Sequence, residues 1–231
     1  AVLAVVLAPV GLSFIPLWLM EQGLNWILAV ARNVSSLDGA VGRVSAPGPE
    51  TLPLITLGAL LIVLWKGRER WIGLAPVAAA FALWMVTERP ALLISPTGGL
   101  VGLMEAGERH LSKERGDGFV ALSWLENDAD GADQSTAYQR GDGPRMVLGE
   151  HQFLHLTGKR AREASCAGSA ILVLNDEPEA PLDCEAITPN SLRETGAIAF
   201  TLQDASLQKL TAREVTGRRL WNDRKVRERY P

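Results

Sequence analysis

Charge is scarce in the first 88 residues of this 231-residue chain, which carry ten charged side chains, five of each sign. The rest of the chain carries the other thirty-nine, eighteen basic and twenty-one acidic. Ten charged side chains are too few for the surface of an ordinary soluble protein of this size, whereas the second part has a normal number of charged residues. The composition excludes a disordered chain, a collagen-like chain, a disulfide-dense mini-protein and a strongly basic nucleic-acid module. We expect a membrane region over 1–88 and a soluble domain over 89–231.

Residues that carry chemistry are also few, with three histidines and two cysteines in the whole chain. The sequence has no glycine-rich dinucleotide motif, no P-loop and no nucleophile elbow. His151 and His155 are four residues apart, a spacing that suits zinc only on a helix. They lie in a strand-like stretch, where such residues are about 13 Å apart. We therefore expect no metal site, no cofactor and no catalytic residue.

An acidic loop at 127–133 contains Asp128, Asp130 and Asp133. This loop lacks the terminal glutamate of an EF-hand, which completes a calcium site in that motif. We interpret it as a solvated loop.

Three uncharged runs occupy 1–20, 51–65 and 71–87. Twenty helical residues span about 30 Å, the thickness of a bilayer's hydrocarbon core. For the first run a cleaved signal peptide is the alternative, although its start lacks the usual basic residues. For the shorter second and third runs, a pair of core helices in a soluble protein is the alternative. The sequence predicts membrane helices, with an amphipathic stretch at 21–45 beside them.

A basic link, Lys-Gly-Arg-Glu-Arg at 66–70, joins the second and third runs. Short loops rich in lysine and arginine stay on the cytoplasmic side of a membrane. The link is therefore expected inside and everything after Glu88 outside. This predicts a multi-pass protein of the inner (plasma) membrane whose C-terminal domain is periplasmic. Arg32 is the one basic residue within an apolar stretch, facing an aqueous path or reaching to the interface.

The polar half has the pattern of an α+β domain with one core. A hairpin is predicted where two apolar segments flank Pro-Thr-Gly-Gly, and a buried strand where four apolar residues follow one another. The strands are expected at 91–95, 100–104, 146–156, 169–175 and 197–202, and short helices at 118–126 and 189–195.

Cys166 and Cys184 both lie in the part expected outside the membrane. They either pair in a disulfide or remain two unrelated buried thiols. A bond between them would enclose seventeen residues. Such a loop is worth about 3 kcal/mol in the chain-entropy model.

The C-terminus has six basic residues against two acidic ones over 218–229. Basic side chains next to an aromatic ring can contact a phosphate backbone and stack on a base. The alternative is an ordinary solvated tail. The candidate DNA contacts are Arg218, Arg219, Trp221, Arg224 and Lys225.

The chain resembles the C-terminal part of the ComEC family of competence (DNA-uptake) membrane proteins, in the alphaproteobacterial version. The resemblance covers nearly all of the chain and rests on the order in which several segments follow one another. The segments are PLWLMEQGLNWILAVARNVSSLDGAV, PGPETLPL, RPALLISPTGGLVGLM, GFVALSWLENDAD, SCAGSAILVLN, LDCEAITPNSLRETGAIAF and GRRLW.

The resemblance implies part of an inner-membrane channel that passes one DNA strand inward during natural transformation. Its implied partners are single-stranded DNA, the lipid bilayer and other competence machinery proteins. Many members of the family end in a metallo-β-lactamase-like domain with an HxHxDH metal motif. This sequence has no such motif, so no catalytic residue is carried over. If the soluble domain keeps that fold, it keeps it as a degenerate remnant without the metal centre.

The sequence is compatible with two other functions. One is a membrane-tethered, metal-dependent nuclease or hydrolase, which the missing HxHxDH motif opposes. The other is a membrane-anchored structural domain with no role in DNA uptake.

Overall fold

The structure is a computed structural model whose chain forms two compact units, Ala1–Arg43 and Val44–Pro231. It describes residues 2–37, 42–166, 168, 170–203, 206–217 and 219.

The first unit contains helix α1 (Val2–Leu7), the short 3-10 helix η1 (Ala8–Val10) and the long helix α2 (Phe14–Ser35). The uncharged run at 1–20 was expected to form one membrane helix, but the chain breaks at Gly11. Proline at position 9 lacks the N–H that would continue the helix, and Gly11 adopts a left-handed conformation with φ 74°. The long helix therefore starts later and includes most of the expected amphipathic stretch.

Helix α2 is long and apolar enough to cross a membrane, and no other helix among the described residues meets both conditions. Its 22 residues extend over about 33 Å. None of its side chains is buried within the protein. An N-terminal apolar helix is thus part of the architecture, whereas several full-length membrane helices are not shown.

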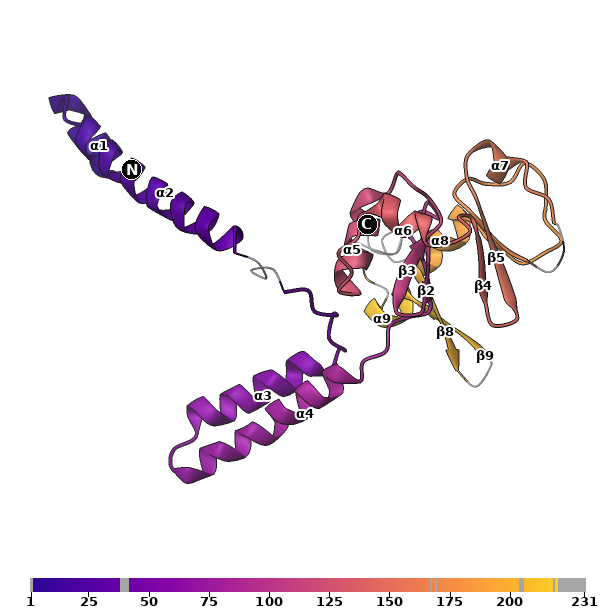
Figure 1. Cartoon of the computed structure of the whole chain (residues 1–231), viewed down its shortest axis with the longest axis horizontal. Helices are drawn as coiled ribbons and strands as arrows, with labels where there is room; N and C mark the ends of the chain where they lie inside the picture. The colour runs from indigo at the N-terminus through magenta and orange to yellow at the C-terminus, as the bar shows by residue number, and fades with distance from the viewer. Residues whose placement is uncertain are drawn as a thin grey trace. The chain divides into compact units, whose positions relative to one another are not determined.

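The second unit begins with a helical hairpin. Helix α3 (Thr51–Leu64) is followed by the 3-10 helix η2 (Arg68–Gly73) and helix α4 (Leu74–Met85), and Figure 1 shows α3 and α4 side by side. Glycine permits this close packing, because a Cβ atom on Gly58 would lie 2.6 Å from the carbonyl oxygen of Gly73. The 14 residues of α3 extend over about 21 Å, less than a bilayer core.

The rest of the second unit is an α+β domain with two sheets. Sheet A is antiparallel, in the order β3-β2-β1-β8-β9, and sheet B has the order β4-β5-β6-β7, with parallel pairing of β5, β6 and β7. The strands of sheet A are β1 (Leu92–Ile94), β2 (Val101–Glu105), β3 (Glu108–Leu111), β8 (Ile198–Gln203) and β9 (Ser206–Thr211). Those of sheet B are β4 (Arg145–Leu148), β5 (His151–Leu156), β6 (Ile171–Leu174) and β7 (Ala186–Ile187).

The main hydrophobic core contains residues from both sheets. Leu92 and Leu103 pair across β1 and β2 and belong to the same buried cluster as Met146 of β4. The rings of Phe153 in β5 and Phe200 in β8 have centroids 5.4 Å apart, which joins the two sheets directly. Burial of such side chains contributes about 1.5–3 kcal/mol each.

Two smaller clusters cover the other faces of the sheets. Helices α5 (Gly118–Asn127) and α6 (Gln134–Gln139) supply apolar residues to a cluster with Leu100 and Leu111. Helix α7 (Lys159–Arg162) supplies Ala161 to a cluster on sheet B. The four residues of β6 alternate between this cluster and the main core, so all four are buried.

The structure confirms the predicted hairpin of β1 and β2, the helix at 118–126 and the strands within 146–156, 169–175 and 197–202. It also confirms the helix at 189–195, which is α8 (Pro189–Thr195). A capping box between Thr188 and Ser191 starts α8, and Gly196 caps its end. The sequence interpretation missed β3, α6, α7, β7, β9 and the final short helix α9 (Ala212–Thr216).

Candidate functional site

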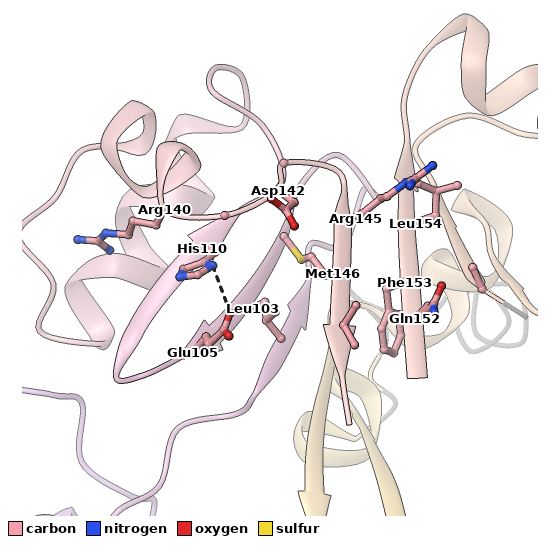
Figure 2. Close-up of a pocket in the computed structure, with 14 residues that line it drawn as sticks. Leu103, Glu105, His110, Arg140, Asp142, Arg145, Met146, Gln152, Phe153 and Leu154 are labelled. Atoms are coloured by element: carbon pink, nitrogen blue, oxygen red, sulfur yellow. Dashed lines mark ion pairs between the residues drawn. The ribbon is translucent and has the colours of Figure 1, made fainter. Parts of the chain in front are cut away.

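A cavity of about 640 Å³ opens between the ends of β2 and β3 and the strands β4 and β5 (Figure 2). The side chains of Leu103, Met146 and Phe153 line it and also belong to the main core. Polar groups from Glu105 and His110 stand on the sheet A side. The cavity therefore combines an apolar base with a polar rim, which is the usual composition of a ligand pocket.

A histidine–carboxylate pair lies in this rim. His110 Nδ1 is 3.7 Å from Glu105 Oε2, as Figure 2 shows by a dashed line. His110 is only 17% exposed, whereas Glu105 is 67% exposed. Gly141 also packs closely against the ring, because a Cβ atom on it would lie 2.7 Å from the same Nδ1. The two side chains lie together in the lining of the cavity.

Arg140 lines the same cavity, but its guanidinium is engaged by other groups. It forms ion pairs with Asp130 and, at 3.3 Å, with Glu108, and it donates a hydrogen bond to the backbone oxygen of Arg109. The hydrogen bond to Asp130 raises the pKa of Arg140 above its ordinary value. Arg140 therefore lines the cavity and also connects the end of α6 to β3.

The acidic loop at 127–133 is not the solvated loop that the sequence suggested. Asp128 is 2% exposed and accepts hydrogen bonds from Arg109 and Arg89. Asp133 caps α6 by accepting the Thr136 N–H at 2.8 Å, and its hydrogen bonds with Thr136 lower the pKa of its carboxyl group. The loop's carboxylates serve as structural partners because the neighbouring strands and helices supply donors.

His151 and His155 both lie in β5, four residues apart on an extended strand. His155 lies in β5 and is 4% exposed, with Nε2 2.9 Å from the backbone oxygen of Gly98. Burial lowers the pKa of His155 to about 4. No group of three or more histidine, cysteine, aspartate or glutamate side chains among the described residues is arranged to hold a metal ion.

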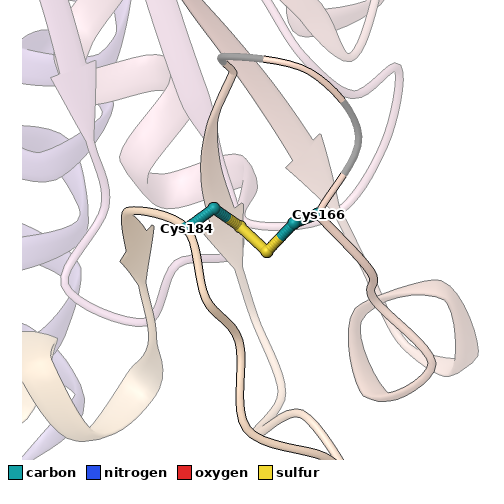
Figure 3. Close-up of a disulfide and its surroundings, with 2 residues drawn as sticks. All are labelled: Cys166 and Cys184. Carbon is teal, nitrogen blue, oxygen red and sulfur yellow. A yellow bond between two sulfur atoms is a disulfide. The ribbon is translucent and has the colours of Figure 1, made fainter.

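The two cysteines are joined. Cys166 and Cys184 form a disulfide with Cα atoms 5.8 Å apart (Figure 3). The bond links the segment after α7 to the segment before β7, and Cys184 packs against the cluster that covers sheet B. It thus fastens the outer layer of sheet B.

The candidate DNA contacts of the C-terminal tail fall mostly outside the described residues. Arg219 is exposed, and its Nε donates a hydrogen bond to the backbone oxygen of Thr216 at 3.2 Å. The tail residues that lie outside the described part of the chain are Arg218, Trp221, Arg224 and Lys225.

Sequence reasoning missed the cavity because its lining comes from strands far apart along the chain. Glu105 and His110 are near neighbours in sequence, and only the tight turn between β2 and β3 brings their side chains together. Neither residue lies in a motif, and neither VGLME of β2 nor ERHL of β3 alternates apolar with polar residues, so the sequence carries no signal for this pair.

Comparisons of the chain with protein-family models, with curated proteins and with solved structures found no match.

Proposed function

We propose that this chain is the C-terminal portion of an inner-membrane channel for uptake of single-stranded DNA in natural transformation, with its α+β domain in the periplasm. The observation that carries the proposal is the disulfide of Cys166 and Cys184 in a domain that follows apolar helices. Disulfides persist on the oxidising side of the membrane and are rare in the cytosol. The bond therefore supports the outward orientation that the basic link at 66–70 favours.

The proposed membrane topology has three crossings, α2 and the two limbs of the hairpin. Helix α2 has the required length. The return limb, Arg68–Met85, combines six 3-10 residues with twelve α-helical ones, which extends it over about 30 Å. Exposed apolar side chains on both limbs suit contact with lipid, among them Val63, Ile72 and Met85. With the link inside, the N-terminal end of α2 is inside and the α+β domain is outside.

The role in DNA uptake draws on the resemblance to the ComEC family and on the basic C-terminal tail. The proposed task of the domain is to hold or guide a strand, since the sequence lacks the HxHxDH motif on which metal-dependent hydrolysis in that family depends. The bilayer, the strand and other competence proteins are the proposed partners.

Natural transformation of a strain with this gene deleted in frame tests the proposal. We expect transformation frequency to fall to background while labelled DNA is still held outside the inner membrane. The wild-type gene supplied in trans restores transformation, which serves as the control for effects on neighbouring genes. Unchanged transformation would reject the proposal and favour a membrane-anchored structural domain.

A further inference from the structure

A smaller cleft of about 280 Å³ lies beside β5, and none of its lining residues lines the cavity of Figure 2. The segment after β3, helix α6 and the start of α7 all contribute to it. Its lining residues are Ser112, Lys113, Glu114, Arg115, Tyr138, Pro144, His155, Thr157 and Arg160.

The charge of this cleft distinguishes it from the larger cavity. Three basic side chains, Lys113, Arg115 and Arg160, face a single acidic one, Glu114. In the larger cavity two acidic side chains balance two arginines. A concave surface with an excess of one sign concentrates ligands of the opposite sign. The smaller cleft therefore suits an anion.

The basic side chains of the cleft have hydrogen-bond donors available to bind an anion. Arg115 and Arg160 are exposed, and neither forms an ion pair with any residue that the structure describes. Lys113 Nζ is 3.5 Å from Asp117, which leaves further donors on the same ammonium group. Guanidinium groups bind phosphate with two parallel hydrogen bonds, a geometry that favours phosphate over a monatomic anion.

A buried histidine in the wall offers a second, independent indication. His155 Nε2 lies 2.9 Å from a backbone oxygen and must carry a proton to donate to it. Nδ1 is then an acceptor, and it is buried with no hydrogen-bond partner in the described part of the chain. Buried polar atoms are nearly always paired. An acceptor without a donor in the wall of a basic cleft fits an ordered water that bridges to a bound anion, or the hydroxyl of hydrogen phosphate.

We propose that this cleft is a phosphate-binding site, in which Arg115 and Arg160 grip the phosphate oxygens and Lys113 adds charge. The ligand is either a phosphodiester of a nucleic-acid strand or free inorganic phosphate, which share this chemistry. The site goes beyond the proposed role in DNA uptake and does not depend on it, because its evidence lies in the cleft alone.

Binding to the full chain in nanodiscs of zwitterionic phosphatidylcholine tests the site. The probes are a fluorescein-labelled twelve-nucleotide oligothymidylate, followed by fluorescence anisotropy, and inorganic phosphate, followed by calorimetry. The double variant Arg115→Ala/Arg160→Ala removes two exposed arginines from the cleft. Its matched control, Arg162→Ala/Arg193→Ala, removes two exposed arginines elsewhere.

We expect the cleft variant to lose affinity for the oligonucleotide by about tenfold or more, while the control stays within about twofold of the wild type. Displacement of the oligonucleotide by inorganic phosphate supports the same site. Phosphate binding without oligonucleotide binding, lost in the cleft variant, identifies free phosphate as the ligand. Equal binding by the cleft variant and the wild type, or equal weakening in both double variants, overturns the proposal. A transformation defect is measured separately, so either idea can fail alone.

Discussion

Arg109 and Asp128 form a buried ion pair in which the guanidinium donates from Nε and Nη2 to the two carboxylate oxygens. The side chain of Arg109 is completely buried and that of Asp128 is 2% exposed. Arg109 Nη1 and Nη2 also donate to the backbone oxygens of Gly102 and Pro90, each at 3.2 Å. The pair therefore joins β3, β2, the end of α5 and the segment that enters β1.

Substitution of Asp128 by alanine is expected to destabilise the domain strongly, because it leaves the buried charge of Arg109 unpaired. Removing one partner of a buried pair costs about 3–5 kcal/mol. Urea unfolding of the purified chain, followed by near-ultraviolet circular dichroism, measures this loss. Asp142→Ala, at an exposed position, is the control and should lie within about 0.5 kcal/mol of the wild type. Equal midpoints for the two variants would show that the pair adds nothing.

Acidification is expected to weaken the fold through His155. Its pKa is about 4 in the folded chain, lowered from 6.5 by burial, with Lys113 also lowering it and Gly98 and Asp117 opposing the shift. Between these values the unfolded chain binds a proton that the folded chain does not. Stability therefore falls as pH drops from about 6.5 to 4, by up to about 3 kcal/mol.

Urea unfolding at several pH values, compared between the wild type and His155→Gln, isolates this contribution. The variant should have a smaller slope of stability against pH over that window. Identical slopes would mean that other groups cause the acid sensitivity.

Loss of the disulfide is expected to lower stability by about 3 kcal/mol, since the bond closes a loop between residues 18 apart in sequence. Cys166→Ser/Cys184→Ser removes the bond, and thermal melting with and without reductant measures the effect. Reductant should lower the melting temperature of the wild type and leave that of the double variant unchanged. A wild-type melt that is insensitive to reductant contradicts this account.

The helical hairpin should tolerate no side chain at Gly58. A Cβ atom there would lie 2.5 Å from Val77 Cγ2 and 2.6 Å from the Gly73 carbonyl oxygen. Gly58→Val is expected to push α3 and α4 apart and to reduce the amount of folded protein in membranes several-fold. Gly23→Val in α2 is the control, because a Cβ atom on Gly23 would meet no other atom within 4 Å. Similar yields of the two variants would rule out tight packing at Gly58.

Local signals explain what the sequence could predict of the fold. Proline at 189 and glycine at 196 delimit α8, and the continuous apolar run of β6 reflects its burial on both sides. The break at Gly11 was not predicted, because membrane helices tolerate proline and glycine where neighbouring groups satisfy the freed carbonyls. The roles of Asp128 and Asp130 were missed because their partners, Arg109 and Arg140, come from separate elements. From sequence alone, a carboxylate in a polar loop is expected to face water. Only the tertiary structure shows that a buried donor lies next to it.

The same reason limits prediction of the sites. The disulfide could be proposed from the sequence, because the chain has only two cysteines and each could pair only with the other. The basic cleft could not, because Arg115 and Arg160 are 45 positions apart and neither lies in a motif. Arginine and lysine are common surface residues, so the sequence alone does not show which of them lie close together in the folded domain.

Protease access from outside the inner membrane tests the proposed periplasmic position of the α+β domain. In spheroplasts, a protease that cannot cross the inner membrane is added to the full chain carrying an epitope tag at its C-terminus. We expect loss of the tag in intact spheroplasts, with a cytoplasmic marker protein left whole. A tag that survives until the membrane is disrupted would place the domain in the cytoplasm and reject the proposed orientation.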